Sequence, residues 1–281
     1  MRFACVQFDI VWEDKAANHA TIERMLDQAQ PRIEPGTFVL LPELGETGFS
    51  MNLDRIADDR SLMWAIDLAK RRRIYLQHGF ARRASPAAAA TPQGRNCAVI
   101  VSPAGEVLAD YEKIHPFSYG REAEHYSGGD HLCIARCGDA NVCPLICYDL
   151  RFPEIWRLAA LAEPGAEIFT IGASWPSTRQ HHWRALCIAR AIEQQAYVVA
   201  VNRCGRDPHV AYSGGSLIVS PRGEVVAEAG DSPIVLQADV DLAALRSWRA
   251  EFPALRDVHR EFLGHTRIQQ PPRSARPSPA T

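Results

Sequence analysis

Three reactive side chains stand where candidate strands of the sequence end. Cys147 closes the apolar stretch 144–147, Glu43 follows the all-apolar run 38–41 and one proline, and Lys113 follows the run 107–111. Short apolar runs of this kind are typical of strands in a sheet that is covered on both faces. A thiol, a carboxylate and an ammonium at the ends of three strands can converge on one point, where they could carry out nucleophilic catalysis.

The segment PLICYDLRFPE, residues 144–154, has the pattern of a nucleophile elbow. Its first residues indicate the end of a buried strand, and Pro153 suits the first turn of a helix, where its missing N–H costs nothing. A thiol on such a turn projects from the top of the sheet, and the next backbone N–H groups point into the same space. Taken alone, Cys147 could equally be an inert buried cysteine, since free cysteine is commonly buried.

The thiol needs a base or a cation beside it, because cysteine attacks as the thiolate and its ordinary pKa is about 8.5. None of the ten histidines lies at an obvious strand end with a carboxylate to orient it. Glu43, with its pKa raised by burial, could take the thiol proton and later return it to a departing amine. Lys113 and the backbone N–H of Tyr148 could hold the oxyanion of a tetrahedral intermediate. Taken singly, Glu43 and Lys113 could also be a capped loop glutamate and a surface lysine.

The elements that must position these residues alternate between strands and helices. Strands are predicted at residues 2–9, 38–41, 74–81, 107–111, 131–135, 142–147, 166–171, 197–202 and 234–240, and helices at 16–30, 53–73, from 153, at 179–194 and from 241. Two matching hairpins, IVSPAGEV at 100–107 and IVSPRGEV at 218–225, suggest two similar sheets. This order predicts an α/β fold, a four-layer α-β-β-α sandwich with two mixed sheets.

Composition places limits on the class of protein. The chain has 281 residues, with 47% hydrophobic and 23% charged, which suits a globular domain. We expect one domain over residues 1–265 and a disordered tail over 266–281, where Pro, Ser and Arg dominate. A net charge of −2 gives no field that favours nucleic acid or an anionic membrane, and no apolar run approaches the roughly 20 residues of a membrane span. The start of the chain reads as a strand rather than a signal peptide, so we expect a cytoplasmic protein whose eight cysteines are thiols.

The blocks LPELGETGF, YEKIHPF and ICYDLRFPE resemble, in the correct order, the three catalytic blocks of the nitrilase superfamily of carbon–nitrogen hydrolases. The similarity extends over roughly residues 2–263. It implies the α-β-β-α sandwich, a triad of Glu43, Lys113 and Cys147, and a thioester acyl-enzyme that is hydrolysed by water activated by the same glutamate. A second glutamate often follows the lysine block, and Glu122 is the more plausible choice here, with Glu124 the alternative. The resemblance further implies a homodimer or higher homo-oligomer, and no cofactor or metal is expected.

Within this superfamily, the stretches 113–130 and 172–205 look most like the omega-amidase branch, whose members hydrolyse the terminal amide of 2-oxoglutaramate or 2-oxosuccinamate and release ammonia. Such small-molecule amide substrates carry a remote carboxylate, which a bidentate arginine can hold. Arg151 and Arg179 are the candidates for this contact, and Trp175 could form a wall of the pocket. Each arginine could instead be a surface or helix-capping residue, and Trp175 could belong to the core.

Other interpretations stay open. An N-carbamoyl amine or amino acid hydrolase, or a true nitrilase, would share the scaffold and the mechanism. A non-catalytic zinc- or ligand-binding protein is the alternative from another class, because Cys133, Cys137, Cys143 and Cys147 form two equally spaced pairs. Residues four apart on a strand lie about 13 Å from each other, however, which zinc–sulfur bonds cannot span.

Overall fold

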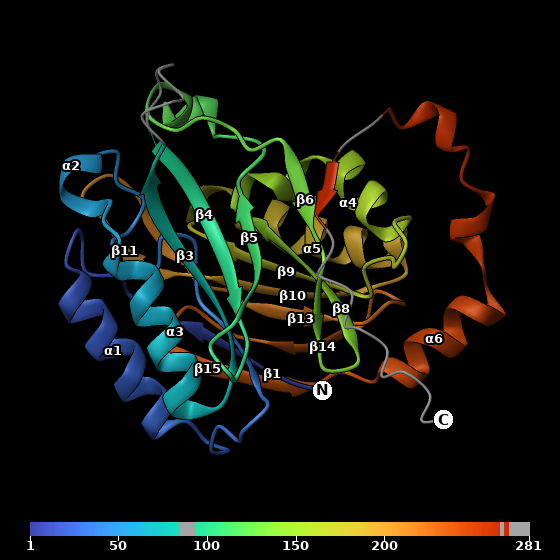
Figure 1. Ribbon diagram of the computed structural model, residues 1–281, viewed down its shortest axis with the longest axis horizontal. Coiled ribbons are helices and arrows are strands. Elements are labelled where there is room, and N and C mark those ends of the chain that lie inside the picture. Colours follow the sequence, from blue (N-terminus) through green and yellow to red (C-terminus); the bar gives the residue numbers. More distant parts are fainter. Residues whose placement is uncertain (85–93, 265–266, 270–281) are drawn as a thin grey trace, which may run out of the picture.

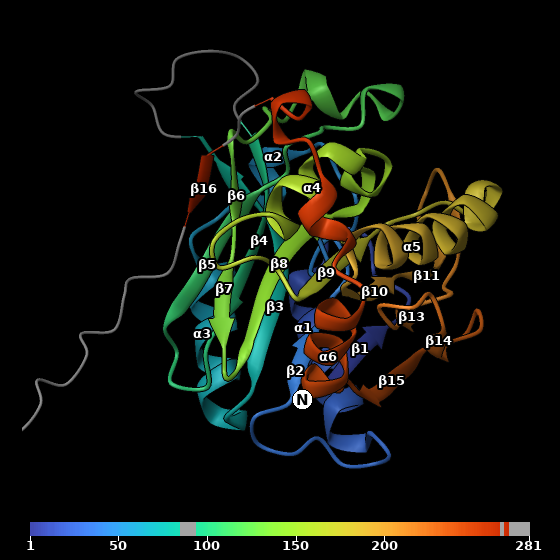
Figure 2. The same cartoon turned by 90° about the vertical axis from the view of Figure 1, so that its right-hand side faces the viewer.

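Two six-stranded sheets lie face to face in the computed structural model, which describes residues 1–84, 94–264 and 267–269 (Figures 1 and 2). The first sheet contains β1 (Arg2–Gln7), β2 (Phe38–Leu40), β3 (Tyr75–Arg83), β4 (Gly94–Val101), β5 (Val107–Glu112) and β15 (Ile234–Asp239). The second contains β7 (Ala135–Cys137), β8 (Ala140–Ile146), β9 (Ile168–Ala173), β10 (Tyr197–Asn202), β13 (Leu217–Val219) and β14 (Val225–Glu228). Their strand orders are β15-β1-β2-β3-β4-β5 and β14-β13-β10-β9-β8-β7.

Both sheets are mixed, as the sequence predicts. In the first, β1, β2 and β3 run parallel, whereas β15, β4 and β5 pair in the antiparallel sense. In the second, β8, β9 and β10 are parallel, and β7, β13 and β14 are antiparallel to their neighbours. Because the three parallel strands of each sheet lie at its centre, their carboxyl ends are natural places for a site.

The hydrophobic core lies mainly between the two sheets. Side chains along β1 point alternately to the two faces of the first sheet. Phe3 and Cys5 belong to the core between the two sheets, and Ala4 and Val6 pack under the helices on the outer face. Helices α1 (Lys15–Gln28) and α3 (Arg60–Arg72) cover the outer face of the first sheet, and α4 (Pro153–Ala160) and α5 (Gln180–Gln194) cover the second (Figures 1 and 2). The predicted α-β-β-α sandwich is confirmed.

The two predicted hairpins occupy equivalent positions, one in each sheet. Between β4 and β5, Gly105 donates its N–H to the carbonyl of Ser102 at 2.8 Å, and between β13 and β14, Gly223 donates to Ser220 at 2.9 Å. Both glycines have a φ of 85°, a left-handed conformation that disfavours a side chain. The repeated Ser-Pro-x-Gly sequence therefore makes the same turn twice.

One predicted helix differs from the structure. The segment 53–73 forms two helices, α2 (Leu53–Ile56) and α3. The side chain of Asp58 accepts a hydrogen bond from the N–H of Arg60 at 2.9 Å and pairs with Lys15 on α1 at 3.0 Å, so a carboxylate that could cap a helix start interrupts the segment. By contrast, Asp14 caps α1 and accepts a hydrogen bond from the N–H of Ala17 at 3.0 Å.

The remaining elements complete the chain. They are α6 (Leu242–Glu251), β6 (His131–Cys133), β11 (Cys204–Arg206), β12 (Ala211–Ser213), β16 (Arg267–Gln269), and the 3₁₀ helices η1 (Ser118–Gly120), η2 (Glu122–Glu124), η3 (Cys147–Arg151), η4 (Ser177–Arg179), η5 (Ala254–Asp257) and η6 (Arg260–Phe262). Within the tail predicted from residue 266, β16 is ordered and pairs in parallel with β6, which corrects that prediction for these three residues. The rest of the tail, 266 and 270–281, lies outside the described residues, as do residues 85–93. Among the helices of the described part, none combines the length and the apolar character that crossing a bilayer requires.

Candidate active site

A cavity of about 840 Å³ opens where strands of both sheets end, and it contains the three residues singled out from the sequence. Glu43 lies just beyond β2, Lys113 directly follows β5, and Cys147 directly follows β8. The first two come from one sheet and the thiol from the other. The cavity is also lined by the other residues singled out from the sequence: Tyr148 for its backbone N–H, Arg151 and Arg179 as candidates for binding a carboxylate, and Trp175 as a candidate wall.

Lys113 connects two buried carboxylates. Its ammonium lies 2.7 Å from Oε1 of Glu43 and 2.8 Å from Oε2 of Glu122, and all three side chains are essentially inaccessible to water. Burial alone would lower the pKa of Lys113, but the two carboxylates outweigh it and raise the pKa above its ordinary value. The lysine therefore stays charged at any pH the protein meets. Glu124 instead pairs with Arg121 on the surface, so the structure places Glu122 in this cluster and not Glu124.

Asn96 on β4 joins the same cluster and was missed from the sequence. Its Nδ2 donates to Oε1 of Glu43 at 2.9 Å and to Oε1 of Glu122 at 2.8 Å. The backbone carbonyl of Asn96 also accepts from the N–H of Lys113 at 2.8 Å. A single asparagine within a strand carries no sequence signal of this role, because the pairing of β4 with its neighbours in the sheet brings it to the carboxylates.

Cys147 occupies a strained elbow between β8 and α4. Its φ of 42° lies in the left-handed region, which non-glycine residues rarely adopt and which is typical of nucleophiles on sharp turns. Burial raises the pKa of the thiol, the neighbouring Glu43 carboxylate raises it further, and Lys113 only partly opposes them. The resting group is therefore a thiol and not the thiolate, so its proton must leave as the sulfur attacks.

Glu43 is the group placed to accept that proton. Its Oε2 accepts a hydrogen bond from the backbone N–H of Ser174 at 3.0 Å, while Oε1 is held by Lys113 and Asn96. Ser174 directly follows β9, and its hydroxyl also donates to the carbonyl of Glu43 at 3.3 Å. With both oxygens held, the carboxylate has a fixed orientation in the cavity.

Asp149 links the elbow at Cys147 to the segment around Lys113. Its carboxylate accepts from the N–H of Ile146 at 3.2 Å, from the hydroxyl of Tyr111 at 2.7 Å and from the N–H of His115 at 3.1 Å. The ring Nδ1 of His115 also lies 2.9 Å from Asp149. This pair was not singled out from the sequence, because His115 does not directly follow a strand and Asp149 lies 34 residues further along the chain. His115 does not line the cavity, however, so it holds two loops together instead of acting on the thiol.

Two arginines and a tryptophan form one wall of the cavity. The guanidinium of Arg151 lies 4.7 Å from the ring centre of Trp175, and that of Arg179 lies 5.6 Å from the ring of Phe117. Within the described part of the chain, neither arginine has a carboxylate within ion-pair distance. Burial and the nearby charge of Arg179 lower the pKa of Arg151, which reflects two cations without a counter-ion.

The four cysteines considered as zinc ligands do not form a metal-binding group. Cys133 and Cys137 lie on β6 and β7, and Cys143 and Cys147 lie on β8 and at its end. Among the described residues, the potential metal ligands that do cluster in a group of three are His19, Glu46 and His78. All eight cysteines are free thiols.

Comparison with known proteins agrees with this arrangement. A sequence model of the carbon-nitrogen hydrolase family matches residues 2–250. The chain is 32% identical to 2-oxoglutaramate amidase of Bacillus subtilis over 92% of this chain and 98% of that protein. It is 33% identical to the omega-amidase YafV of Escherichia coli K12, over 92% and 96% of the two chains. Among solved structures, XC1258 of Xanthomonas campestris, a CN-hydrolase superfamily protein, superposes with a TM-score of 0.83 at 28% identity, covering 92% and 97% of the two chains.

A sandwich of this topology, with a carboxylate, an ammonium and a thiol at the strand ends, is the scaffold of enzymes that cleave carbon–nitrogen bonds. The chain belongs to the carbon-nitrogen hydrolase family. The resemblance noted from the three sequence blocks is confirmed.

Proposed function

We propose that this carbon–nitrogen hydrolase is an amidase that cleaves the terminal amide of 2-oxoglutaramate or 2-oxosuccinamate. The observation that carries the proposal is the layout of the cavity. A carboxylate, an ammonium and a thiol lie together in it, and two arginines without carboxylate partners line the wall formed by Trp175. The relatives in Bacillus subtilis and Escherichia coli, which bear the names 2-oxoglutaramate amidase and omega-amidase, support the choice of substrate.

In the proposed mechanism, Glu43 takes the proton of Cys147 while the sulfur attacks the amide carbon. Lys113 and the N–H of Tyr148 hold the resulting oxyanion. Glu43 returns the proton to the amide nitrogen, and the carbon–nitrogen bond breaks. Ammonia departs, and the acyl group remains bound to Cys147 as a thioester. Glu43 then activates a water molecule, which hydrolyses the thioester and restores the thiol. Glu122 keeps Lys113 in position and does not touch the substrate.

The substrate carboxylate would bind between Arg151 and Arg179. An anion there relieves the repulsion that lowers the pKa of Arg151. The stacking of Arg151 on Trp175 orients its planar guanidinium, and such an orientation suits a bidentate contact with a carboxylate. The amide at the other end of a short chain then faces the thiol.

Ammonia release from a matched panel tests this proposal. The panel is 2-oxoglutaramate, 2-oxosuccinamate, an N-carbamoyl amino acid and an aliphatic nitrile, each assayed with the native enzyme and with Cys147→Ala as the blank. We expect the highest kcat/KM for one of the two oxo-acid amides. A clear preference for the nitrile or for the carbamoyl compound would assign the cavity to a sibling reaction on the same scaffold.

The proposal extends to the assembly and location of the enzyme. We propose a single domain, a homodimer and a cytoplasmic protein. Ile192 near the end of α5 and Phe252 after α6 are 52% and 54% exposed. The side chain of Gln195 donates to the carbonyl of Phe252, which places both residues at the same end of α5, and exposed apolar residues of this kind could form a dimer interface. The eight unpaired thiols, by contrast, bear on location, because they suit a reducing compartment. Light scattering on the eluted protein tests the dimer, and a monomer mass would exclude it.

A further inference from the structure

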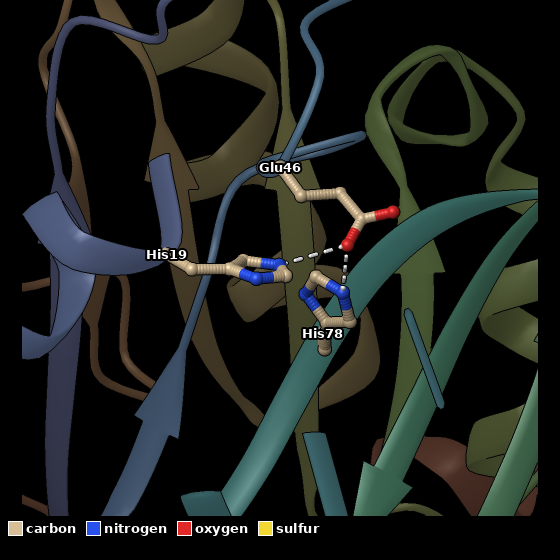
Figure 3. Close-up of side chains that lie close together, drawn as sticks. All are labelled: His19, Glu46 and His78. Carbon is tan, nitrogen blue, oxygen red and sulfur yellow. Dashed lines mark hydrogen bonds and ion pairs between the residues drawn. The ribbon is translucent and has the colours of Figure 1, made fainter. Parts of the chain in front are cut away.

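A second cluster of reactive side chains lies outside the catalytic cavity. It consists of His19 on α1, Glu46 in the loop after β2, and His78 on β3 (Figure 3). Within the described residues it is the group that brings three potential metal ligands within reach of one another. None of the three lines the cavity, so the proposed chemistry leaves them without a role.

The spacing of the three ligand atoms suits a small divalent ion. Oε2 of Glu46 lies 3.0 Å from Nε2 of His19 and 3.3 Å from Nε2 of His78. Figure 3 draws both contacts as dashed lines. All three atoms lie within 4.8 Å of one another. Two ligands held at about 2.1 Å from a tetrahedral zinc ion lie about 3.4 Å apart. The two nitrogen–oxygen spacings are therefore close to those of a tetrahedral site, and the two imidazole ligand atoms lie within 4.8 Å of each other.

The second oxygen of Glu46 is already held, which turns the first toward the imidazoles. Ser61 donates its hydroxyl to Oε1 at 2.5 Å, and the ammonium of Lys15 lies 3.1 Å from the same atom. Lys15 also pairs with Asp58 at 3.0 Å, so its charge is shared between two carboxylates. Partners of this kind orient a metal-binding carboxylate in known sites. With neutral imidazoles the cluster keeps one excess negative charge, which favours a cation.

Burial shields the cluster while leaving an entry path. The side chains of Glu46 and His78 are 0% exposed, and that of His19 is 18% exposed. The ring of His19 is stacked on Trp64, with the ring centres 3.8 Å apart, and this contact fixes its orientation. An ion would therefore reach the cluster along the open edge of His19.

We propose that His19, Glu46 and His78 bind one divalent transition-metal ion, with zinc as the natural probe. Two imidazoles and one carboxylate are a ligand set that such ions accept. The ion would join α1, β3 and the loop that carries Glu43, so its role is to stabilise the fold. The Nδ1 atom of His78 has no hydrogen-bond partner, and a metal on Nε2 moves the proton to this unpartnered atom. We therefore expect this unpartnered N–H to weaken the affinity for the ion.

The test is titration of the chelator-treated, full-length protein with Zn²⁺ by calorimetry and with Co²⁺ by absorption. We expect one ion per chain and a visible cobalt spectrum without the intense near-ultraviolet band of a cobalt–thiolate bond. His19→Ala and Glu46→Gln should each lower the affinity at least tenfold. His259→Ala is the matched control, because His259 forms a similar pair with Glu261, 3.0 Å apart but on the surface, and it should leave binding unchanged.

A second readout is the melting temperature, which Zn²⁺ should raise for the native chain and for His259→Ala but not for His19→Ala. His19 is partly exposed, so its replacement leaves a folded protein with which to compare. The proposal is overturned if no ion binds, if His19→Ala binds as tightly as the native chain, or if binding disappears only when Cys147 is replaced. In each of those cases the cluster is a hydrogen-bond network and nothing more.

Discussion

The ammonium of Lys113 lies 2.7 Å from Oε1 of Glu43, although 70 residues of chain separate the two. Neither group is accessible to water, and Glu122 holds the ammonium from the other side at 2.8 Å. A buried carboxylate without a cation is costly, so the two acidic residues and the lysine depend on one another. This relationship makes the cluster both a part of the fold and the centre of the proposed chemistry.

Replacing the lysine tests this dependence. Lys113→Met leaves two buried carboxylates unpaired, and we expect a loss of about 3–5 kcal/mol in the free energy of unfolding, together with loss of activity. Adding Glu122→Gln should restore part of the stability but none of the activity. Urea unfolding measures both variants. Arg184→Met, which breaks an exposed pair with Glu228, is the control and should cost less than about 1 kcal/mol. Equal costs for the two single variants would contradict the description of the cluster.

Asn96 should act on turnover and not on substrate binding. Asn96→Asp places a third carboxylate beside Glu43 and Glu122, which disfavours ionised Glu43, and we expect kcat to fall 10–100-fold with KM nearly unchanged. Asn96→Ala removes two hydrogen bonds to charged acceptors, each typically worth about 1.5–3 kcal/mol, and should also lower stability. Steady-state kinetics separates the two effects. Asn141→Ala, which removes a strand asparagine far from the cavity, should leave kcat unchanged; a comparable loss there would remove the special role of Asn96.

The two cavity arginines should distinguish charged from uncharged substrates. With Arg151→Gln or Arg179→Gln, we expect KM for 2-oxoglutaramate to rise about 10–100-fold, as a lost charge-assisted hydrogen bond implies. The KM for a neutral aliphatic amide should change little. The measurement is ammonia release over a range of each substrate. A parallel loss on the neutral amide would show that the arginines shape the cavity and do not bind a carboxylate.

The cysteines should separate into one reactive thiol and seven protected ones. Cys147 is 9% exposed, whereas the other seven are 0–1% exposed. We expect a thiol reagent at pH 8 to modify Cys147 in the native protein and all eight cysteines in denaturant. Prior incubation with a substrate that forms the thioester should slow the native reaction. Rapid modification of several thiols in the native state would contradict the buried positions.

The buried thiols should also make the stability of the protein depend on pH. Burial raises the pKa of Cys133 and of Cys137 to about 12. The folded state then binds the thiol protons more tightly than the unfolded chain, whose thiols titrate near 8.5. Their contribution to stability is complete below that pH and is lost as pH rises above it. The free energy of unfolding should therefore fall from about pH 8.5 upward.

Cys147→Ala should abolish hydrolysis while leaving the protein folded. Removal of a catalytic nucleophile commonly lowers kcat by about 10⁴-fold or more. The residue lies at the end of β8 with a φ of 42°, which alanine must adopt just as cysteine does, so the substitution leaves the elbow unchanged and removes only the packing of one sulfur atom. Circular dichroism and melting confirm the fold, and mass spectrometry of the native enzyme during turnover should detect the thioester. Turnover that persists in the variant would mean that another group is the nucleophile.

Much of this architecture could be predicted from the sequence because local signals agreed with it. The strand at 197–202 and the paired Ser-Pro-x-Gly turns follow from short-range patterns that the structure reproduces. The meeting of residues 43, 113 and 147 was expected because each follows a strand. The resemblance of three ordered blocks then made their convergence specific.

The parts that were missed depend on contacts across the fold. Asn96 reaches the two carboxylates through the pairing of β4 with its neighbours in the sheet, and Asp149 meets His115 only because the elbow packs against the segment around Lys113. The break between α2 and α3 follows from the long-range pair of Asp58 with Lys15. In the same way, Glu46 and His78 are 32 residues apart, and no short motif indicates that their side chains meet.

The placement of the reacting groups on two different sheets has a consequence for the whole sandwich. Glu43 and Lys113 are supplied by one layer and Cys147 by the other. A slip of about 1 Å between layers is enough to misalign groups that must meet at bonding distance. The turnover number therefore depends on how the two sheets are aligned. A substitution that places an oversized side chain in the core between the sheets would lower activity, although the protein would still unfold as one cooperative unit.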